Sequence, residues 1–215
     1  RPGGIKSERG KRKYIHNTVA HISKIDLGKY VLNGLGTKNV LRFLTAFLFH
    51  NGLTGHRIQF FTDGHKVLND SILKWFSWHK NIGIILDWYH LEKKCKEQLS
   101  LALKGRFIRN EILEKLKPLL WHGLVDEAVV HLEGIDKESI KQVETIEKLV
   151  EYLRRNKPYI PCYAVRKELG LCNSSAIGEK MNDLVVSSRQ KHNGMSWSKE
   201  GSAGLATITA IKRNK

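Results

Sequence analysis

Two short β-rich or apolar runs, each closed by an aspartate, constrain the fold of this chain more than any other feature. Residues 57–62 form a β-rich run that ends at Asp63-Gly64, and Ile82–Leu86 is an almost wholly apolar run that ends at Asp87. The second run is typical of a strand covered on both faces. Helical periodicity follows each run, so the pattern predicts an α/β fold with a partly parallel sheet and right-handed crossovers.

The residues before these two units predict an antiparallel hairpin and a helix. Alternation over 15–25 and 29–35 indicates two strands joined by a turn at 26–28. Apolar residues then fall at helical spacing over 39–53, with Asn51-Gly52 as a stop signal.

After residue 104 the strand signal disappears and helical periodicity takes over. The segments 108–120, 124–132 and 140–153 carry apolar residues at helical spacing, and the pattern closes at Pro158 and Pro161. Helical patterns resume over 164–169, 175–186 and 202–211. We therefore predict four parts: a basic arm or loop (1–14), the first part of an α/β core (15–104), an all-helical insertion (105–172) and returning core helices (173–215).

The charge of the chain points to an anionic partner. Lys and Arg number 37 against 21 Asp and Glu in 215 residues, a formal net charge of +16. Self-repulsion of this size favours a polyanion as partner, and we expect nucleic acid. No window approaches the ~20 apolar residues of a membrane span, so no membrane partner is expected. The three cysteines have no zinc spacing, which favours a reducing compartment.

Asp63 and Asp87 are the first candidates for a functional site. Both follow predicted strands, and ligands of open α/β sheets bind at the carboxyl ends of strands. A carboxylate there suits a divalent cation, since hard cations prefer oxygen ligands. The alternative is that each aspartate caps the helix that follows it. Glu179, taken alone, is typical of a solvated surface residue.

Three motifs in order resemble those of DDE-type transposases of bacterial insertion sequences, in the branch allied with Mutator-like elements. They are Gln59 through Thr62-Asp63-Gly64-His65-Lys66, then Ile85-Leu86-Asp87-Trp88-Tyr89-His90, and finally Asn173…Gly178-Glu179…Arg189…Gly194-Met195-Ser196-Trp197-Ser198…Gly201. The resemblance covers nearly the whole chain. It implies an RNase H-like core interrupted by a helical insertion, and the 179 − 87 = 92 positions between Asp87 and Glu179 fit that layout.

The resemblance also implies residue roles. Asp63 becomes the second and Glu179 the third acidic ligand of a two-metal site for Mg²⁺ or Mn²⁺, which cleaves DNA and joins strands by in-line displacement at phosphorus. Asp87 and His90 fall on a D/C-x-x-H element, to which we assign a supporting or DNA-contacting role. For His90 the alternatives are packing against the sheet or holding Asp87.

The first aspartate of such a site has no counterpart on a strand of this sequence. The only acid in residues 1–14 is Glu8, in the basic arm, and Asp26 falls in the predicted hairpin turn. The resemblance therefore implies that the first strand and its aspartate lie upstream of Arg1, within a longer reading frame. Rival interpretations are an RNase H-like nuclease such as a junction resolvase, and a non-catalytic DNA-binding remnant.

The implied partners are transposon-end and target DNA, bound by a homo-oligomer in the bacterial cytoplasm at the nucleoid. The expected DNA contacts are basic residues of the amino-terminal arm, together with basic and aromatic residues near the motifs. These are Lys11, Arg12, Lys13, Lys66, Arg189, Lys191 and Trp197. For Trp197 the alternative is a place in the wall of the active site.

Overall fold

The computed structural model describes residues 4–6, 12–14, 16–24, 28–175, 180–190 and 197–214. Within them the fold is mixed α/β, as expected. The chain divides into two compact units, residues 1–56 with 176–215 and residues 57–175. Each unit is described by itself below.

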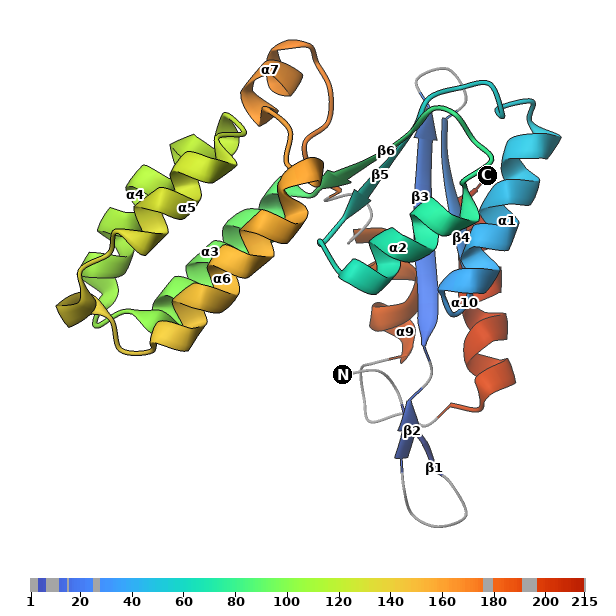
Figure 1. The fold of residues 1–215 in the computed structure, drawn as a ribbon. Helices are drawn as coiled ribbons and strands as arrows, with labels where there is room; N and C mark the ends of the chain where they lie inside the picture. The colour runs from blue at the N-terminus through green and yellow to red at the C-terminus, as the bar shows by residue number, and fades with distance from the viewer. Residues whose placement is uncertain are drawn as a thin grey trace. The chain divides into compact units, whose positions relative to one another are not determined.

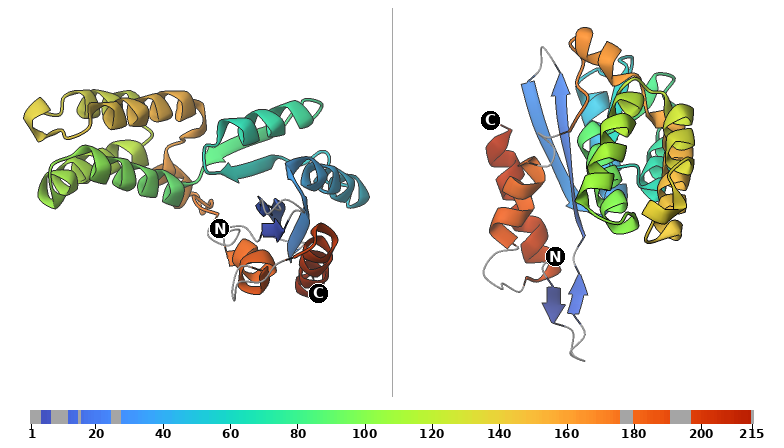
Figure 2. Two further views of the ribbon diagram at one scale, coloured as in Figure 1. Left: turned by 90° about the horizontal axis from the view of Figure 1, so that it is seen from below. Right: turned by 90° about the vertical axis from the view of Figure 1, so that its left-hand side faces the viewer.

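The first unit is built on the predicted hairpin. Strands β3 (Asn17–Lys24) and β4 (Gly28–Leu35) pair antiparallel, from Asn17 opposite Leu35 to Lys24 opposite Gly28. Helix α1 (Thr37–His50) covers one face and helix α10 (Lys199–Arg213) the other (Figure 2). The alternation of β4 explains this layering, because the Tyr30 ring lies 5.1 Å from that of Phe47 in α1, whereas Val31 packs with Ala206 and Ala210 of α10.

Smaller elements complete the first unit. The predicted basic arm contains two short antiparallel strands, β1 (Gly4–Lys6) and β2 (Arg12–Tyr14). A π-helical turn, η3 (Asp183–Ser187), leads into the short helix α9 (Ser188–Gln190). Val185 of this turn is fully buried beside Val31, so the turn closes the same apolar layer as α10.

The second unit begins with the two predicted strand–helix pairs. Strands β5 (Ile58–Thr62) and β6 (Ile82–Leu86) pair in parallel, with Ile58 opposite Ile82 and Thr62 opposite Leu86. Helix α2 (Lys66–Trp75) connects them. Both predicted strands and their parallel pairing are confirmed.

Four longer helices form most of the rest of the second unit. They are α3 (Trp88–Ala102), α4 (Arg106–Trp121), α5 (Val125–Glu133) and α6 (Val143–Asn156). Each packs against two of the others, α3 against α4 and α6, and α5 against α4 and α6, so they enclose one apolar core (Figure 1). The 3-10 turns η1 (Lys137–Ser139) and η2 (Lys157–Tyr159) flank α6, and the short helix α7 (Tyr163–Glu168) follows. The predicted helical character of 105–172 is confirmed.

The start of one predicted helix differs from the structure. Ile140 was expected to begin a helix, yet it forms a β-bridge with Leu103, and the N–H groups of Lys141 and Gln142 donate to the Ala102 carbonyl. These bonds hold the connection extended, so α6 starts only at Val143.

The two compact units cut across the predicted parts of the chain. Residues 57–104, from the predicted part 15–104, lie in the same unit as the helical segment 105–172. The physical reason is a continuous apolar cluster, which extends from Ile85 and Leu86 of β6 to Leu149 and Leu153 of α6.

Among the described helices, none combines the length and apolar character needed to cross a membrane.

Candidate functional site at the carboxyl ends of strands β5 and β6

Asp63 and Asp87 emerge side by side from the parallel pair. Thr62 and Leu86 are the last paired residues of β5 and β6, so the two aspartates follow at the same edge. The backbone N–H of Asp87 donates to the Thr62 carbonyl at 2.8 Å, which extends the ladder by one bond beyond the strands. The parallel register therefore brings both predicted acids to one place.

The Asp87 carboxylate is almost fully buried and accepts bonds on both oxygens. Oδ1 accepts from the backbone N–H of His90 at 3.1 Å, and His90 Nδ1 lies 3.3 Å from the same oxygen. Oδ2 accepts from the hydroxyl of Ser175 at 2.7 Å and from the Ser175 backbone N–H. Asp87 is thus the N-cap of α3, as one of the sequence interpretations held, and it also anchors Ser175.

These contacts decide the protonation state of Asp87. Burial alone raises the pKa of a carboxyl group, but the bonds from the Ser175 N–H and hydroxyl, the bond from the His90 N–H and the charge of His90 outweigh it. The pKa of Asp87 is lowered as a result. The residue is a buried anion that is fully occupied in holding the local structure.

Asp63 has the opposite environment. Its side chain is exposed, and Oδ1 accepts one bond, from the backbone N–H of His65 at 3.0 Å. The N-cap of α2 is His65, so the alternative that Asp63 caps this helix is wrong. The reason is that the turn at Gly64 delays the helix, and the Asp63 side chain closes that turn instead.

Gly64 fixes the position of Asp63. Its φ of +79° is a left-handed conformation that favours glycine. An added Cβ would lie 2.9 Å from both Leu86 Cδ1 and the Tyr152 hydroxyl. That hydroxyl donates to the Asp63 carbonyl at 3.2 Å, so α6 holds the backbone of the turn while the carboxylate points to solvent.

The segment that carries Ser175 is held by α7. The Nδ2 group of Asn173 donates to the Tyr163 carbonyl at 2.8 Å, and the Asn173 carbonyl accepts from the Trp88 N–H at 3.0 Å. The buried Tyr163 hydroxyl donates to the Leu86 carbonyl at 2.6 Å. Residues 173–175 therefore lie against the start of α3, and the last strand and the return from the helical insertion meet at one point.

Arg166 ties the same segment to β5. Its guanidinium donates to the Cys172 carbonyl at 2.6 Å, to Asn173 Oδ1 at 3.2 Å and to Gln59 Oε1 at 3.4 Å. Burial and the positive charge of Arg57 lower the pKa of Arg166. The helical pattern around Arg166 gave no signal of this role, because all three acceptors are uncharged backbone or amide oxygens, two of them beyond the end of α7 and one in β5.

The remaining predicted site residues divide into described and undescribed ones. His90 contacts Asp87, in agreement with the interpretation that it holds this carboxylate. Lys66 is exposed at the start of α2, three residues after Asp63, and Trp197 is half-buried before α10. Other predicted residues lie outside the described part of the structure. These are Glu179, Lys11 and Lys191, together with the side chains of Arg12, Lys13 and Arg189, whose backbone falls in β2 and α9.

The two aspartates differ in their capacity to hold a metal ion. Asp63 offers an exposed carboxylate with one hydrogen bond from the protein, which suits a Mg²⁺ or Mn²⁺ ligand. Asp87 uses both oxygens internally, which supports the expectation that it is a supporting residue rather than a ligand. Within the described ranges, no three His, Cys, Asp or Glu side chains gather as a metal-binding group.

Comparisons with known proteins found no matching family model, no similar curated protein and no similar solved structure.

Proposed function

We propose that the chain is the catalytic part of a DDE-type insertion-sequence transposase with an RNase H-like core. In this proposal Asp63 and Glu179 hold divalent cations, and the first aspartate comes from upstream of Arg1. The observation that carries the proposal is the placement of Asp63 and Asp87 at one edge of a parallel pair, one exposed and one buried. We interpret this edge as part of a transposase active site because the sequence motifs resemble those of DDE-type transposases.

Two further features support the proposal. The helical segment enters after Asp87 and returns at Ser175, four residues before Glu179, as the resemblance implies for the insertion. The net charge of +16 suits a protein that handles DNA. Bound Mg²⁺ would activate the attacking oxygen and stabilise the leaving one. The chain itself contributes the fixed turn at Gly64, which aims Asp63 outward, and the buried Asp87, which fixes the edge.

Nicking and strand transfer of supercoiled plasmid DNA test the proposal. The chain and a version extended upstream of Arg1 are compared in Mg²⁺ and in Mn²⁺, each with Asp63→Asn and Glu179→Gln. Asp70→Asn and Glu168→Gln are matched controls, since both residues are exposed. We expect the extended protein to nick and to join strands, both site substitutions to abolish these activities, and both controls to retain them.

The rival functions predict different results. Metal-dependent hydrolysis without joined products would favour an RNase H-like nuclease such as a junction resolvase. DNA binding without cleavage in either metal would leave the non-catalytic DNA-binding remnant as the better interpretation.

A further inference from the structure

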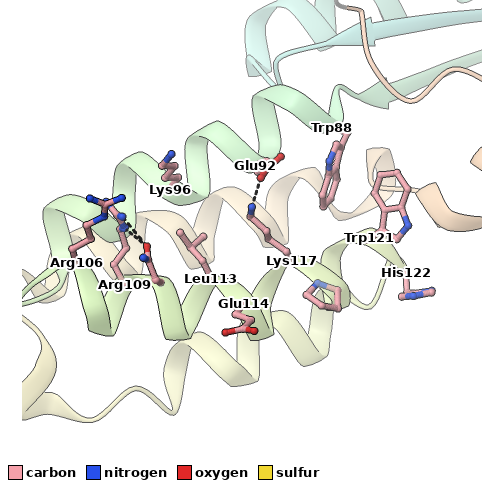
Figure 3. Close-up of a pocket in the computed structure, with 12 residues that line it drawn as sticks. Trp88, Glu92, Lys96, Arg106, Arg109, Leu113, Glu114, Lys117, Trp121 and His122 are labelled. Carbon is pink, nitrogen blue, oxygen red and sulfur yellow. Dashed lines mark hydrogen bonds and ion pairs between the residues drawn. The ribbon is translucent and has the colours of Figure 1, made fainter.

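A groove runs between α3 and α4 in the helical part of the second unit. Its volume is about 660 Å³, and residues of both helices line it (Figure 3). An ion pair between Glu92 of α3 and Lys117 of α4 bridges its middle. The sequence motifs gave none of the lining residues a role, although Trp88 lies within the second motif.

One end of the groove is cationic. Lys96, Arg106 and Arg109 gather there (Figure 3), and none of the three forms an ion pair with the described residues. Arg109 is oriented by hydrogen bonds to Asn110 Oδ1 at 2.7 Å and to the Ser100 hydroxyl at 3.1 Å. Because Lys117 already neutralises Glu92, three cations face the single remaining acid of the lining, Glu114. This end therefore favours an anionic ligand.

The other end is aromatic. The rings of Trp88 and Trp121 meet edge to face with centroids 4.8 Å apart, and both line the groove (Figure 3). Tyr163 packs against both rings and donates to the Leu86 carbonyl, so the pair is fixed in place. Trp88 directly follows Asp87. The aromatic end thus begins one residue from the carboxyl edge of β6.

We propose that this groove binds a single strand of DNA, with a base on the Trp88 and Trp121 rings and phosphates on Lys96, Arg106 and Arg109. The proposal takes its DNA partner from the proposed function. Aromatic rings next to cations are typical of single-strand binding, because unpaired bases stack on the rings while a duplex keeps its bases stacked inside. From Trp88 to Lys96 the helix rises about 12 Å at ~1.5 Å per residue. At ~3.4 Å per nucleotide this spans about three to four nucleotides of a stacked strand.

Fluorescence anisotropy with a labelled oligothymidylate of about ten nucleotides tests the proposal. It is done on the full chain in EDTA, so that binding is measured without cleavage. The groove variant carries Lys96→Gln, Arg106→Gln and Arg109→Gln. The control variant, with Lys115→Gln, Lys137→Gln and Lys148→Gln, loses the same charge at exposed positions outside the groove lining.

We expect at least a tenfold loss of affinity in the groove variant, and a salt slope smaller by about 2, since each phosphate contact on a single strand contributes ~0.7. The control variant should bind nearly as the parent does. Trp121→Phe should reduce the quenching of tryptophan fluorescence by the oligonucleotide, with its fold checked by circular dichroism. A blunt duplex of equal length should not show the groove-specific loss.

Two results would overturn the proposal: equal affinities of the groove and control variants, or the same groove-specific loss with the duplex. A failure of the proposed function is distinguishable, because it would leave the EDTA binding results intact while metal-dependent cleavage is absent.

Discussion

Replacing Asp87 by asparagine should destabilise the fold by about 3 kcal/mol at pH 7. Asparagine can still accept the His90 N–H bond and cap α3, but its amide nitrogen then faces the Ser175 N–H and hydroxyl, which donate to Oδ2 in the parent protein. If the amide is reversed, the cap is lost instead. Each hydrogen bond to a charged group contributes ~1.5–3 kcal/mol, so two lost bonds with partial rescue by water give about 3.

Urea denaturation followed by far-UV circular dichroism measures this loss. For a chain of this size the same change lowers the melting temperature by roughly 6–12 °C. Ser175→Ala removes the hydroxyl bond to the carboxylate but keeps the backbone bond, and should cost about 1.5–3 kcal/mol. The double variant should lose less than the sum of the single losses, because both substitutions remove the same bond between Ser175 and Asp87.

The pH dependence supplies an independent check. The folded-state pKa of Asp87 is lowered from its ordinary value of 3.8, so its stabilising contribution is present above pH 3.8 and is lost as pH falls through the folded pKa. The gap between the parent and Asp87→Asn should therefore be constant from pH 7 to about pH 5 and shrink below pH 3.8. A loss under ~1 kcal/mol at pH 7, or a gap that persists at the lowest pH, would refute the reasoning.

Three further predictions concern the surroundings of the same edge and the cysteines. Gly64→Ala should cost about 2–4 kcal/mol in urea denaturation, since φ is +79° and the new methyl group would lie 2.9 Å from the Tyr152 hydroxyl; an unchanged midpoint would contradict the packing described. Arg166→Lys keeps the charge but loses the hydrogen bonds of the guanidinium to backbone and amide oxygens, and should lower the free energy of unfolding by about 1–3 kcal/mol. Urea denaturation measures this loss as well. A loss below ~0.5 kcal/mol would contradict the role given to the guanidinium. In native protein at pH 8 a thiol reagent should modify the exposed Cys172 quickly and Cys95 only after unfolding, because burial raises the pKa of the Cys95 thiol to about 12. Cys172→Ser should remove the fast phase of modification. Fast modification of Cys95 in the native protein would contradict its burial.

Most of the elements could be predicted from local patterns. The apolar run Ile82–Leu86 became β6 with the expected bounds, and alternation over 15–35 became the β3–β4 hairpin. Such elements are fixed by which side chains face the core, and this information is local. The start of α6 was missed because Ile140 continues the apolar period, while its backbone bonds to the end of α3.

The site could be predicted in part. Asp63 and Asp87 follow strands, and the parallel register was enough to place them together. Their different environments could not be predicted, because these depend on Ser175, Tyr152 and other residues that are distant in sequence. The capping alternative was right for Asp87 and wrong for Asp63, and a single glycine after Asp63 accounts for the difference.

The bond between Asp87 and Ser175 has a consequence for how this chain can vary. The two residues are 88 positions apart, yet they meet at one point, so the helical segment leaves and rejoins the sheet edge through a common stem. Loop-closure entropy rises only slowly with length, so added or removed residues at the distal connections cost little. Changes in the length of α4 and α5 would leave the register of β5 and β6 unchanged. The stem makes the helical segment a module that can change while the edge it grows from stays fixed.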